Sequence, residues 1–387
     1  MSNVPSDGPL AGVRVVEVSS VIMAPMAGRL LAKLGADVIK VEPPGGDVLR
    51  RVAAPGGRAM NGAVLTLNEG KRSVEIDAKT EDGRAALRRL MQKADIVLTN
   101  LLPHRRAAYG LDWPAVQGLN PRLILCTAQG YASDSDLADL PAYDDTVQAA
   151  SGVCDVYGKS DGEPRYAPYV MADKICGLSM VYATLAALHS RHVTGAGQWV
   201  DVPMVDVMAD FNCVEQLNDF TFDPPGGPAG WHRTVNPTRR PQRCLDGWIC
   251  VLPYTDRDWG YFCALAQRPE LIGDPRTADH AARVANTEAV QQAIAEWVGP
   301  LTMDEVEQRC QDARIPVQRV VAIEDLVTDT YLRGRGSMRR ADHPSIGSYW
   351  STSPGLTYSA TPTGPVGPAP FAGQHRTLLD GYGEDEP

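Results

Sequence analysis

The residue whose surroundings most suggest chemistry is Asp173. It lies in the segment YVMADKICG at 169–177, downstream of the pair Tyr143-Asp144 and upstream of the turn-like run TGAGQWVDV. An acid at the start of an apolar helix is most often an N-cap, which accepts a backbone N–H and contributes about 1 kcal/mol. The same position also favours an ionised carboxylate through the helix dipole, as a nucleophile requires. Both interpretations follow from the residues.

Several elements are predicted around these acids. The first third of the chain alternates β-branched runs (VRVVEV, DVIKVE, SVEID, DIVLT and RLILCT) with helical stretches (APMAGRLLAKLGA and EDGRAALRRLMQKA). Such alternation indicates a parallel α/β sheet with helices on its faces. Apolar residues then recur at helical spacing, at Ile175, Leu178, Val181, Leu185 and Leu188. The spacing predicts a long helix that starts just after Asp173.

The length of 387 residues predicts two domains, because a single core rarely grows that large. Composition changes around 223–227, where DPPGG occurs. We therefore expect a first domain over 1–222 and a second over 223–335. The second contains the helical stretch NTEAVQQAIAEWV and a capping box that begins at Thr302.

Charge and cysteine content narrow the class of protein. The net charge is -10, the pI is about 5.2, and the basic residues are scattered, which disfavours nucleic acid and anionic membranes as partners. No signal-like N-terminus or run of 18 apolar residues is found. The eight cysteines include no C-x-x-C pair, so we expect reduced thiols in a cytoplasmic protein without a metal site.

Many short strings occur in one characteristic order, among them PLAGVRVVEVSS, GADVIKVEPPGGDVLR, LNEGKRSVEIDAKTEDGR, ADIVLTN, AYDDTVQAASG and SRHVTGAGQWVDV. In this order they resemble the class III CoA-transferase family of the CaiB/BaiF type, which includes formyl-CoA transferase, carnitine CoA-transferase and the α-methylacyl-CoA racemases. The resemblance ends near APFAGQH and so spans almost the whole chain.

The resemblance implies a fold. It predicts an α/β protein with a large Rossmann-like parallel-sheet domain and a smaller α+β domain. The C-terminal segment, 336–387, is expected to return to the large domain. The family also implies a homodimer of interlocked rings.

The resemblance implies that Asp173 is the nucleophile. A carboxylate can attack an acyl thioester, hold the acyl group as an anhydride, and then carry CoA as a thioester to a second acid. This requires acyl-CoA and a free carboxylic acid as substrates, with no metal and no permanently bound cofactor. Tyr143 and Asp144 fall at the pair that the family places beside the nucleophile. Asp201 and Asp206 are interpreted as turn and surface positions.

Three other functions fit the sequence less well. The racemases have a histidine where this chain has Tyr143, and a tyrosine with a pKa of about 10 is a poor base at neutral pH. A non-catalytic CoA-binding protein would not need Asp173. A nicotinamide-dependent dehydrogenase is disfavoured because the first turn, SSVIMAPMAG, lacks G-x-G-x-x-G.

Candidate CoA contacts also come from the resemblance. Lys71 and Arg72 in NEGKRS could pair with phosphate, although such a pair is more often a solvated turn. Asn100 matches a family asparagine near CoA, and a strand-end cap is an equally good interpretation.

The sequence departs from the family in places. Pro43 stands where many members have arginine, and Leu102 interrupts another expected basic segment, so Arg105 or Arg106 could supply the missing charge. Ile22 or a neighbour replaces the glutamine expected of formyl-CoA transferases, which disfavours formyl transfer.

The identity of the acid substrate is left open. The segment Gly226-Gly227-Pro228-Ala229-Gly230 is either a loop that covers the site or an interdomain turn, and the turn is slightly favoured.

Overall fold

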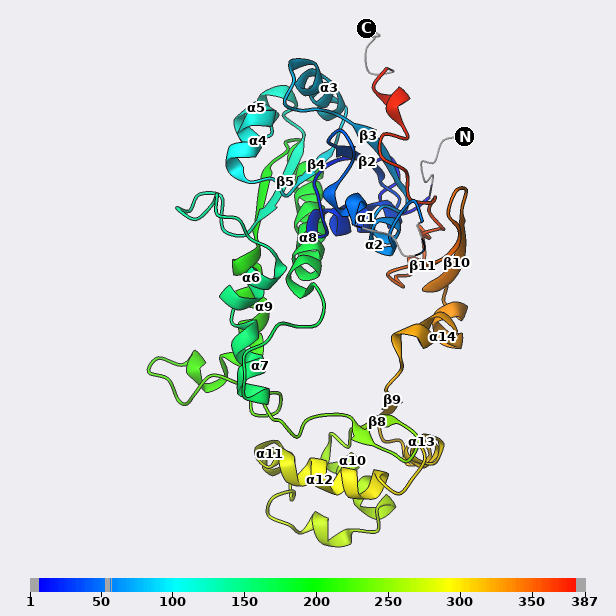
Figure 1. Cartoon of the computed structure of the whole chain (residues 1–387). Coiled ribbons are helices and arrows are strands. Elements are labelled where there is room, and N and C mark those ends of the chain that lie inside the picture. Colours follow the sequence, from blue (N-terminus) through cyan, green and yellow to red (C-terminus); the bar gives the residue numbers. More distant parts are fainter. Residues whose placement is uncertain (1–6, 53–55, 57, 381–387) are drawn as a thin grey trace. The chain divides into compact units, whose positions relative to one another are not determined.

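The chain forms two compact units in the computed structural model, which describes residues 7–52, 56 and 58–380 (Figure 1). Unit 1 comprises Met1–Ser151, Ala167–Phe211 and Val327–Pro387, and unit 2 comprises Gly152–Tyr166 and Asn212–Leu326. The chain therefore passes from one unit to the other at four points, whereas the sequence predicted boundaries only near 222 and 335. The short excursion of 152–166 into unit 2 had no signal in the composition.

Unit 1 contains a six-stranded parallel sheet, as the sequence predicted. The strand order is β3-β2-β1-β4-β5-β6. The strands are β1 (Arg14–Val18), β2 (Asp37–Glu42), β3 (Lys71–Glu75), β4 (Ile96–Thr99), β5 (Ile124–Gln129) and β6 (Trp199–Pro203). β1, β2, β4 and β5 are almost entirely buried, which explains their β-branched runs. Strand order reverses between β1 and β4, the point where open α/β sheets usually bind ligands.

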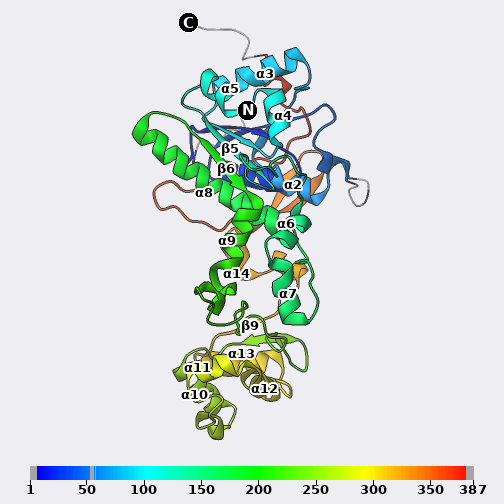
Figure 2. The same ribbon diagram turned by 90° about the vertical axis from the view of Figure 1, so that its left-hand side faces the viewer.

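Helices cover both faces of this sheet. On one face α3 (Glu81–Gln92) and α5 (Trp113–Leu119) bury apolar side chains against β-branched residues of the strands. On the other face α1 (Met23–Lys33) packs against α8 (Met171–Thr194), and α8 runs along β5 and β6 (Figure 2). The remaining helices of this layer and its ends are α2 (Gly62–Leu67), α4 (Pro103–Tyr109), α6 (Asp144–Ala150) and α9 (Met204–Gln216).

Helix α8 is long and apolar enough to cross a membrane by length and composition, and no other helix in the described part of the chain is. A core helix of a soluble protein passes the same test. Cys176 and Met180 of α8 are fully buried, and α8 packs on α1 and the sheet. The apolar composition of α8 is thus explained by its place in unit 1.

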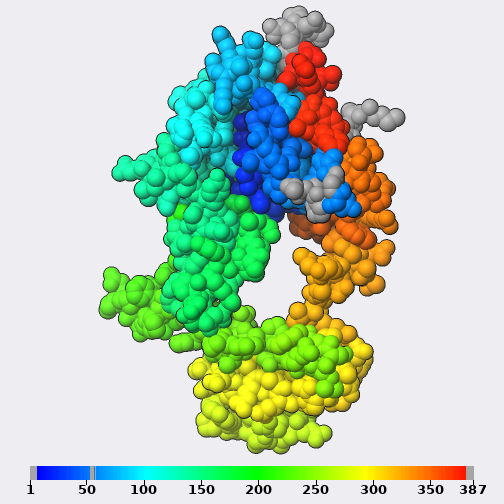
Figure 3. All heavy atoms as spheres, viewed as in Figure 1, coloured from blue at the N-terminus to red at the C-terminus, as the bar shows by residue number. Residues whose placement is uncertain are grey.

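The C-terminal segment belongs to unit 1, where it lies against the N-terminal part of the sheet (Figure 3). It forms α14 (Thr330–Gly334) and a hairpin of β10 (Met338–His343) and β11 (Gly347–Thr352). The Tyr349 hydroxyl donates to Glu69 at 2.7 Å, and the Ser351 hydroxyl donates to the same carboxylate at 2.9 Å. The return of this segment to the large unit agrees with what the family resemblance implied.

Unit 2 is a smaller α+β unit. Its antiparallel sheet has the order β7-β8-β9, from Gln242–Arg243, Trp248–Val251 and Val317–Arg319. Its helices are α7 (Val153–Asp161), α10 (Asp256–Leu265), α11 (His280–Ala285), α12 (Thr287–Val298) and α13 (Met303–Asp312). The predicted capping box is confirmed, because Thr302 and Glu305 exchange hydrogen bonds at the start of α13. Gly226–Gly230 lies inside unit 2, so the interdomain-turn interpretation is wrong.

A fully buried ion cluster holds α1 onto the sheet. The Glu17 carboxylate pairs with Lys40 at 2.9 Å and with Lys71 at 2.7 Å, and Lys40 also pairs with Asp47 at 3.1 Å. Gly28 of α1 lies directly on Glu17, because a Cβ added there would stand 1.9 Å from the Glu17 Oε2 atom. Only glycine allows α1 to approach this closely.

We therefore expect Gly28→Ala to destabilise the protein by about 2–4 kcal/mol, since the new methyl group would push the Glu17 carboxylate away from its two lysines. Unfolding in guanidinium chloride measures the change. Gly118→Ala in α5 is the matched control, because no heavy atom lies within 4 Å of the added Cβ. The control should be neutral or stabilising by up to about 1 kcal/mol. Equal effects of the two substitutions would contradict this account of Gly28.

Candidate active site

Asp173 lies inside the first turn of α8. The helix begins at Met171, slightly before the predicted start, and its N-cap is Val170. No side-chain cap bond is made at Val170, and Asp173 is a helical residue two positions beyond the start. The interpretation of Asp173 as an N-cap is therefore wrong. Its carboxylate is partly buried and accepts no hydrogen bond from the described residues.

The cap of α8 comes instead from Asp144 on another helix. The Asp144 Oδ2 atom accepts the backbone N–H of Asp173 at 2.9 Å, and Asp144 is only 6% exposed. Its other oxygen accepts from the side-chain amide of Gln148, one turn along α6. The side-chain amide oxygen of Gln148 in turn accepts the Ala167 N–H at 2.9 Å. The arrangement fixes Asp144 and places its charge beside the carboxylate of Asp173.

Burial and the charge of Asp144 together raise the pKa of Asp173 to about 6. Both causes disfavour the ionised form, and they outweigh the favourable effect of the helix N-terminus. At neutral pH about nine in ten molecules would still carry the ionised side chain. Asp173 is thus a carboxylate with higher basicity than usual and with unused oxygen atoms, which suits attack on an electrophilic carbon.

The described residues near this carboxylate provide neither an ionised thiol nor a metal site. Burial, followed by the charges of Asp173 and Asp144, raises the pKa of the Cys176 thiol to about 12, so it is protonated at neutral pH. None of the eight cysteines, all of which lie in the described part of the chain, forms a disulfide. Within residues 7–52, 56 and 58–380 no group of three or more His, Cys, Asp or Glu could hold a metal ion.

The two later acids differ from each other. Asp206 is exposed on α9, as predicted. Asp201 lies in strand β6 rather than in a turn, and its carboxylate accepts hydrogen bonds from Thr127, Gln129 and Ser133. Its oxygen atoms are occupied in holding the ends of β5 and β6 together.

Tyr143 precedes Asp144 at the start of α6, and its ring is largely exposed (70%). The Tyr143 N–H donates to the Thr146 hydroxyl at 3.0 Å, and that hydroxyl donates to the Tyr143 carbonyl at 2.8 Å. These bonds set the start of α6 and so orient Asp144. They leave the Tyr143 side chain at the surface of unit 1.

Lys71 and Arg72 do not lie where a phosphate could reach them directly. Lys71 is 1% exposed, and its ammonium is bound to Glu17 and to the Pro25 carbonyl at 2.9 Å. The Arg72 guanidinium pairs with Asp37, the first residue of β2. Both residues begin strand β3, so they lie at the amino end of the sheet rather than at its ligand-binding edge. Their positions do not support the predicted phosphate contacts.

Asn100, by contrast, lies at the carboxyl ends of β1 and β4. Its side chain accepts the Ser20 N–H at 3.1 Å and donates to the Ser20 carbonyl at 2.9 Å. The adjoining Val21 has a φ of 68°, an unfavourable conformation for a β-branched residue, and its N–H donates to Asp47. Asn100 therefore clamps a strained loop at the reversal of strand order, where functional strain commonly concentrates.

The two arginines of α4 have different environments. Arg106 is buried, and its guanidinium donates to Gln129 at 2.9 Å and to Ser133 at 2.8 Å. Arg105 is exposed, and no described residue forms a side-chain hydrogen bond or ion pair with it. Of the two, Arg105 alone is free to meet an anionic ligand.

Arg50 supplies a positive charge near Pro43 that the sequence analysis missed. It pairs with both oxygens of Glu42, at 2.6 and 2.7 Å. Burial would raise the pKa of Glu42, but the bonds and charge of Arg50 lower it to about 2. Arg50 thus places a cation on the acid that directly precedes Pro43.

Gln148 was also missed. Its only signal in the sequence is the spacing of four residues after Asp144, which puts the two side chains on one face of a helix. Neither its full burial nor its second bond, to Ala167, is visible in the sequence.

An acid fixed at a helix start, a Rossmann-like strand order and a clamped loop at the strand-order reversal define a site on an α/β fold of enzyme type. The model of CoA-transferase family III matches residues 10–376, and the chain belongs to this family. It is an enzyme of the family III CoA-transferase class.

Similar proteins agree with this assignment. The chain is 32% identical to the succinate–glutarate CoA-transferase of Agrobacterium fabrum, over 96% of this chain and 94% of the relative. It is 29% identical to the succinyl-CoA:mesaconate CoA-transferase of Haloarcula hispanica, over 97% of each. The crystal structure of a CaiB/BaiF family protein from Brucella suis covers 97% of this chain and 99% of its own, with a TM-score of 0.81 and 28% identity.

The raised pKa of Asp173 predicts that the ionised side chain destabilises the folded protein. The native pKa of about 6 lies above the ordinary value of 3.8, so between these pH values the folded protein binds the proton more tightly than the unfolded chain. The contribution of Asp173 to stability therefore falls as pH rises from about 4 to about 6. We expect Asp173→Asn to be more stable than the wild type by about 1–3 kcal/mol at pH 7.5, with the gain lost at pH 4.

Urea unfolding of both proteins at the two pH values measures this difference. Asp206→Asn, at an exposed position of α9, controls for the substitution itself. A gain of the same size at both pH values would contradict the raised pKa.

Proposed function

We propose that this enzyme transfers CoA from an acyl-CoA thioester to a free carboxylic acid through covalent intermediates on Asp173. The observation that supports this most strongly is the Asp173 carboxylate itself. It accepts no hydrogen bond from any residue that the structure describes, its pKa is raised to about 6, and it stands beside a fixed second acid. Such a group is poised as a nucleophile rather than as a structural contact.

The reaction balances without a metal or an electron carrier. An Asp173 oxygen bonds to the acyl carbon, the C–S bond breaks and CoA thiolate leaves. The thiolate then attacks the side-chain carbonyl carbon of Asp173, which releases the first acid and leaves an aspartyl-CoA thioester. The acceptor carboxylate attacks that thioester, and the thiolate finally takes the acceptor's acyl group, which restores the Asp173 carboxylate.

Asp144 would assist by electrostatics. Repulsion between the two carboxylates raises the free energy of the ionised enzyme, and it disappears when Asp173 becomes a neutral anhydride or thioester. The Asp144–Gln148 bond keeps the second charge in place during these steps. Racemisation is less favoured, since Tyr143 stands where the racemases have the histidine that would move the α-proton.

Substrate classes follow from the relatives, several of which are named for succinyl-CoA and dicarboxylic acids. We infer that short dicarboxylates and their CoA esters are the substrates to test first. CoA would bind at the strand-order reversal, near Asn100 and with Arg105 available for a phosphate. A cytoplasmic homodimer with no permanently bound cofactor remains part of this proposal.

Trapping experiments test the proposal. The protein is mixed with succinyl-CoA in hydroxylamine, digested and analysed by peptide mass spectrometry. We expect a hydroxamate on the peptide that carries Asp173, because hydroxylamine captures anhydrides and thioesters. In Asp173→Ala the adduct should be absent and transfer to glutarate should fall by at least about 10³-fold.

Asp206→Ala is the control, because it removes an exposed carboxylate from α9 and should leave both signals intact. A panel of other acyl-CoAs guards against an unsuitable donor. Undiminished transfer by Asp173→Ala, or an adduct confined to another residue, would refute the assignment of Asp173.

A further inference from the structure

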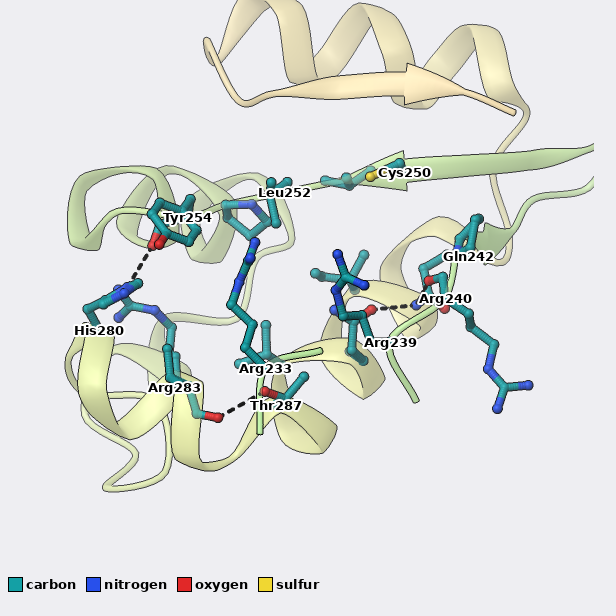
Figure 4. A pocket seen from close by; sticks show the side chains of 17 residues that line it. Arg233, Arg239, Arg240, Gln242, Cys250, Leu252, Tyr254, His280, Arg283 and Thr287 are labelled. Atoms are coloured by element: carbon teal, nitrogen blue, oxygen red, sulfur yellow. Dashed lines mark hydrogen bonds between the residues drawn. The ribbon is translucent and has the colours of Figure 1, made fainter. Parts of the chain in front are cut away.

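Unit 2 contains a cavity of about 280 Å³ that the proposed reaction does not use (Figure 4). Its apolar part is formed by Val251 and Leu252 at the end of strand β8 and by three residues of α11 and α12, Val284, Val290 and Ile294. The volume lies near the lower end of the range for small-molecule sites, about 300–1,000 Å³. The cavity can therefore hold a small organic molecule with an apolar body.

One side of the cavity carries Arg233, which is held by aromatic rings. Its guanidinium lies 5.0 Å from the centre of the Tyr254 ring and 5.4 Å from the centre of the Trp231 ring. Tyr254 is itself packed edge-on against His280, with ring centres 4.9 Å apart. The two rings orient the guanidinium without occupying its N–H donors, so Arg233 is preorganised for an anion.

Arg239 provides a second positive charge. Its side chain points toward the cavity in the close-up, and no described residue forms a hydrogen bond or ion pair with its guanidinium. The other two arginines that line the cavity are already engaged. Arg240 donates to the Pro237 carbonyl, and Arg283 pairs with Asp256. Of these four arginines, Arg233 and Arg239 are thus the two whose guanidinium N–H groups form no hydrogen bond or ion pair with the described residues.

Among the described residues, no aspartate or glutamate lines the cavity. This contrasts with the chain as a whole, whose net charge is -10 and in which most buried arginines meet a carboxylate or a carbonyl. Charge-assisted hydrogen bonds to arginine can be bidentate. An anion that accepts hydrogen bonds from both guanidinium groups of this small, partly apolar cavity would therefore be bound most strongly.

We propose that this cavity of unit 2 binds a small organic anion that carries at least two negative charges on an aromatic or apolar body. The guanidinium groups of Arg233 and Arg239 hold the anionic groups, and the body packs on the apolar wall. Phosphate esters of a nucleoside and aromatic polycarboxylates share this chemistry. The site goes beyond the proposed CoA transfer and requires neither Asp173 nor its reaction.

Calorimetric titration of the full-length protein distinguishes the two sources of the anion. One arm uses adenosine 3′,5′-bisphosphate and the other uses benzene-1,2-dicarboxylate, with uncharged adenosine as the negative control. We expect one of the two anions to bind, with an affinity that falls as salt is added. Binding of the nucleotide alone points to phosphate esters, and binding of the dicarboxylate alone points to polycarboxylates.

Variants locate the binding. Arg239→Gln and Arg233→Gln should each weaken it by about tenfold or more, since each removes a charge-assisted contact. Arg243→Gln is the matched control, because Arg243 is an exposed arginine nearby in β7 that lies over the Trp248 ring and does not line the cavity. Arg239 is exposed, so its variant keeps the test valid even if Arg233→Gln fails to fold.

Two results would overturn the proposal. One is that neither anion binds the wild type at concentrations up to about 5 mM, because a site with a Kd above that value would be too weak to be useful. The other is binding that Arg233→Gln and Arg239→Gln leave unchanged, because the anion would then occupy another site, such as the one proposed for CoA. Whether Asp173→Ala loses CoA transfer does not affect either result, so each proposal can be refuted independently of the other.

Discussion

The hydrogen bond from the Asp173 backbone N–H to the Asp144 carboxylate is the contact on which the candidate site depends. It satisfies one of the free N–H groups at the start of α8 and therefore stabilises the long helix that packs along the sheet. The same bond forces two acidic side chains to lie close together in a partly buried place, which raises the pKa of Asp173 to about 6. The stability of α8 and the raised pKa of Asp173 thus depend on one carboxylate, and Gln148 holds that carboxylate in position.

A second constraint comes from the buried charges beneath α1. Glu17 balances Lys40 and Lys71, and breaking one partner of such a cluster is costly because it leaves an unpaired buried charge. The cluster fixes α1 on the sheet, and α1 in turn packs against α8, where Gly177 lies so close to the Met23 carbonyl that an added Cβ would stand 2.8 Å from it. The position of Asp173 at the start of α8 therefore rests on interactions spread through the whole of unit 1.

Much of the fold could be predicted from the sequence, but the site only in part. Continuous β-branched runs predicted the parallel strands because both faces of such a sheet are buried. Asp173 could be singled out because its segment precedes an obvious helix and matches a family pattern. The partnership of Asp144 with Asp173 joins two helices across the intervening segment 152–166, which includes α7. The burial of Lys71 depends on a residue of another strand, so neither is encoded in local spacing. Unit boundaries failed for the same reason, since 152–166 joins unit 2 through contacts with distant residues.

The measurement that tests the central claim most directly is isotope transfer to the enzyme. Acceptor acid labelled with ¹⁸O in its carboxylate is turned over with succinyl-CoA, and the peptide that carries Asp173 is then weighed by mass spectrometry. The account predicts one ¹⁸O in that peptide after a single turnover, because the acceptor leaves one of its oxygens on Asp173 when its acyl group departs with CoA, and a rise towards two after many turnovers. Direct attack of the acceptor on acyl-CoA would pass the label to the released acid and leave the peptide unlabelled, and that result would contradict the covalent role of Asp173.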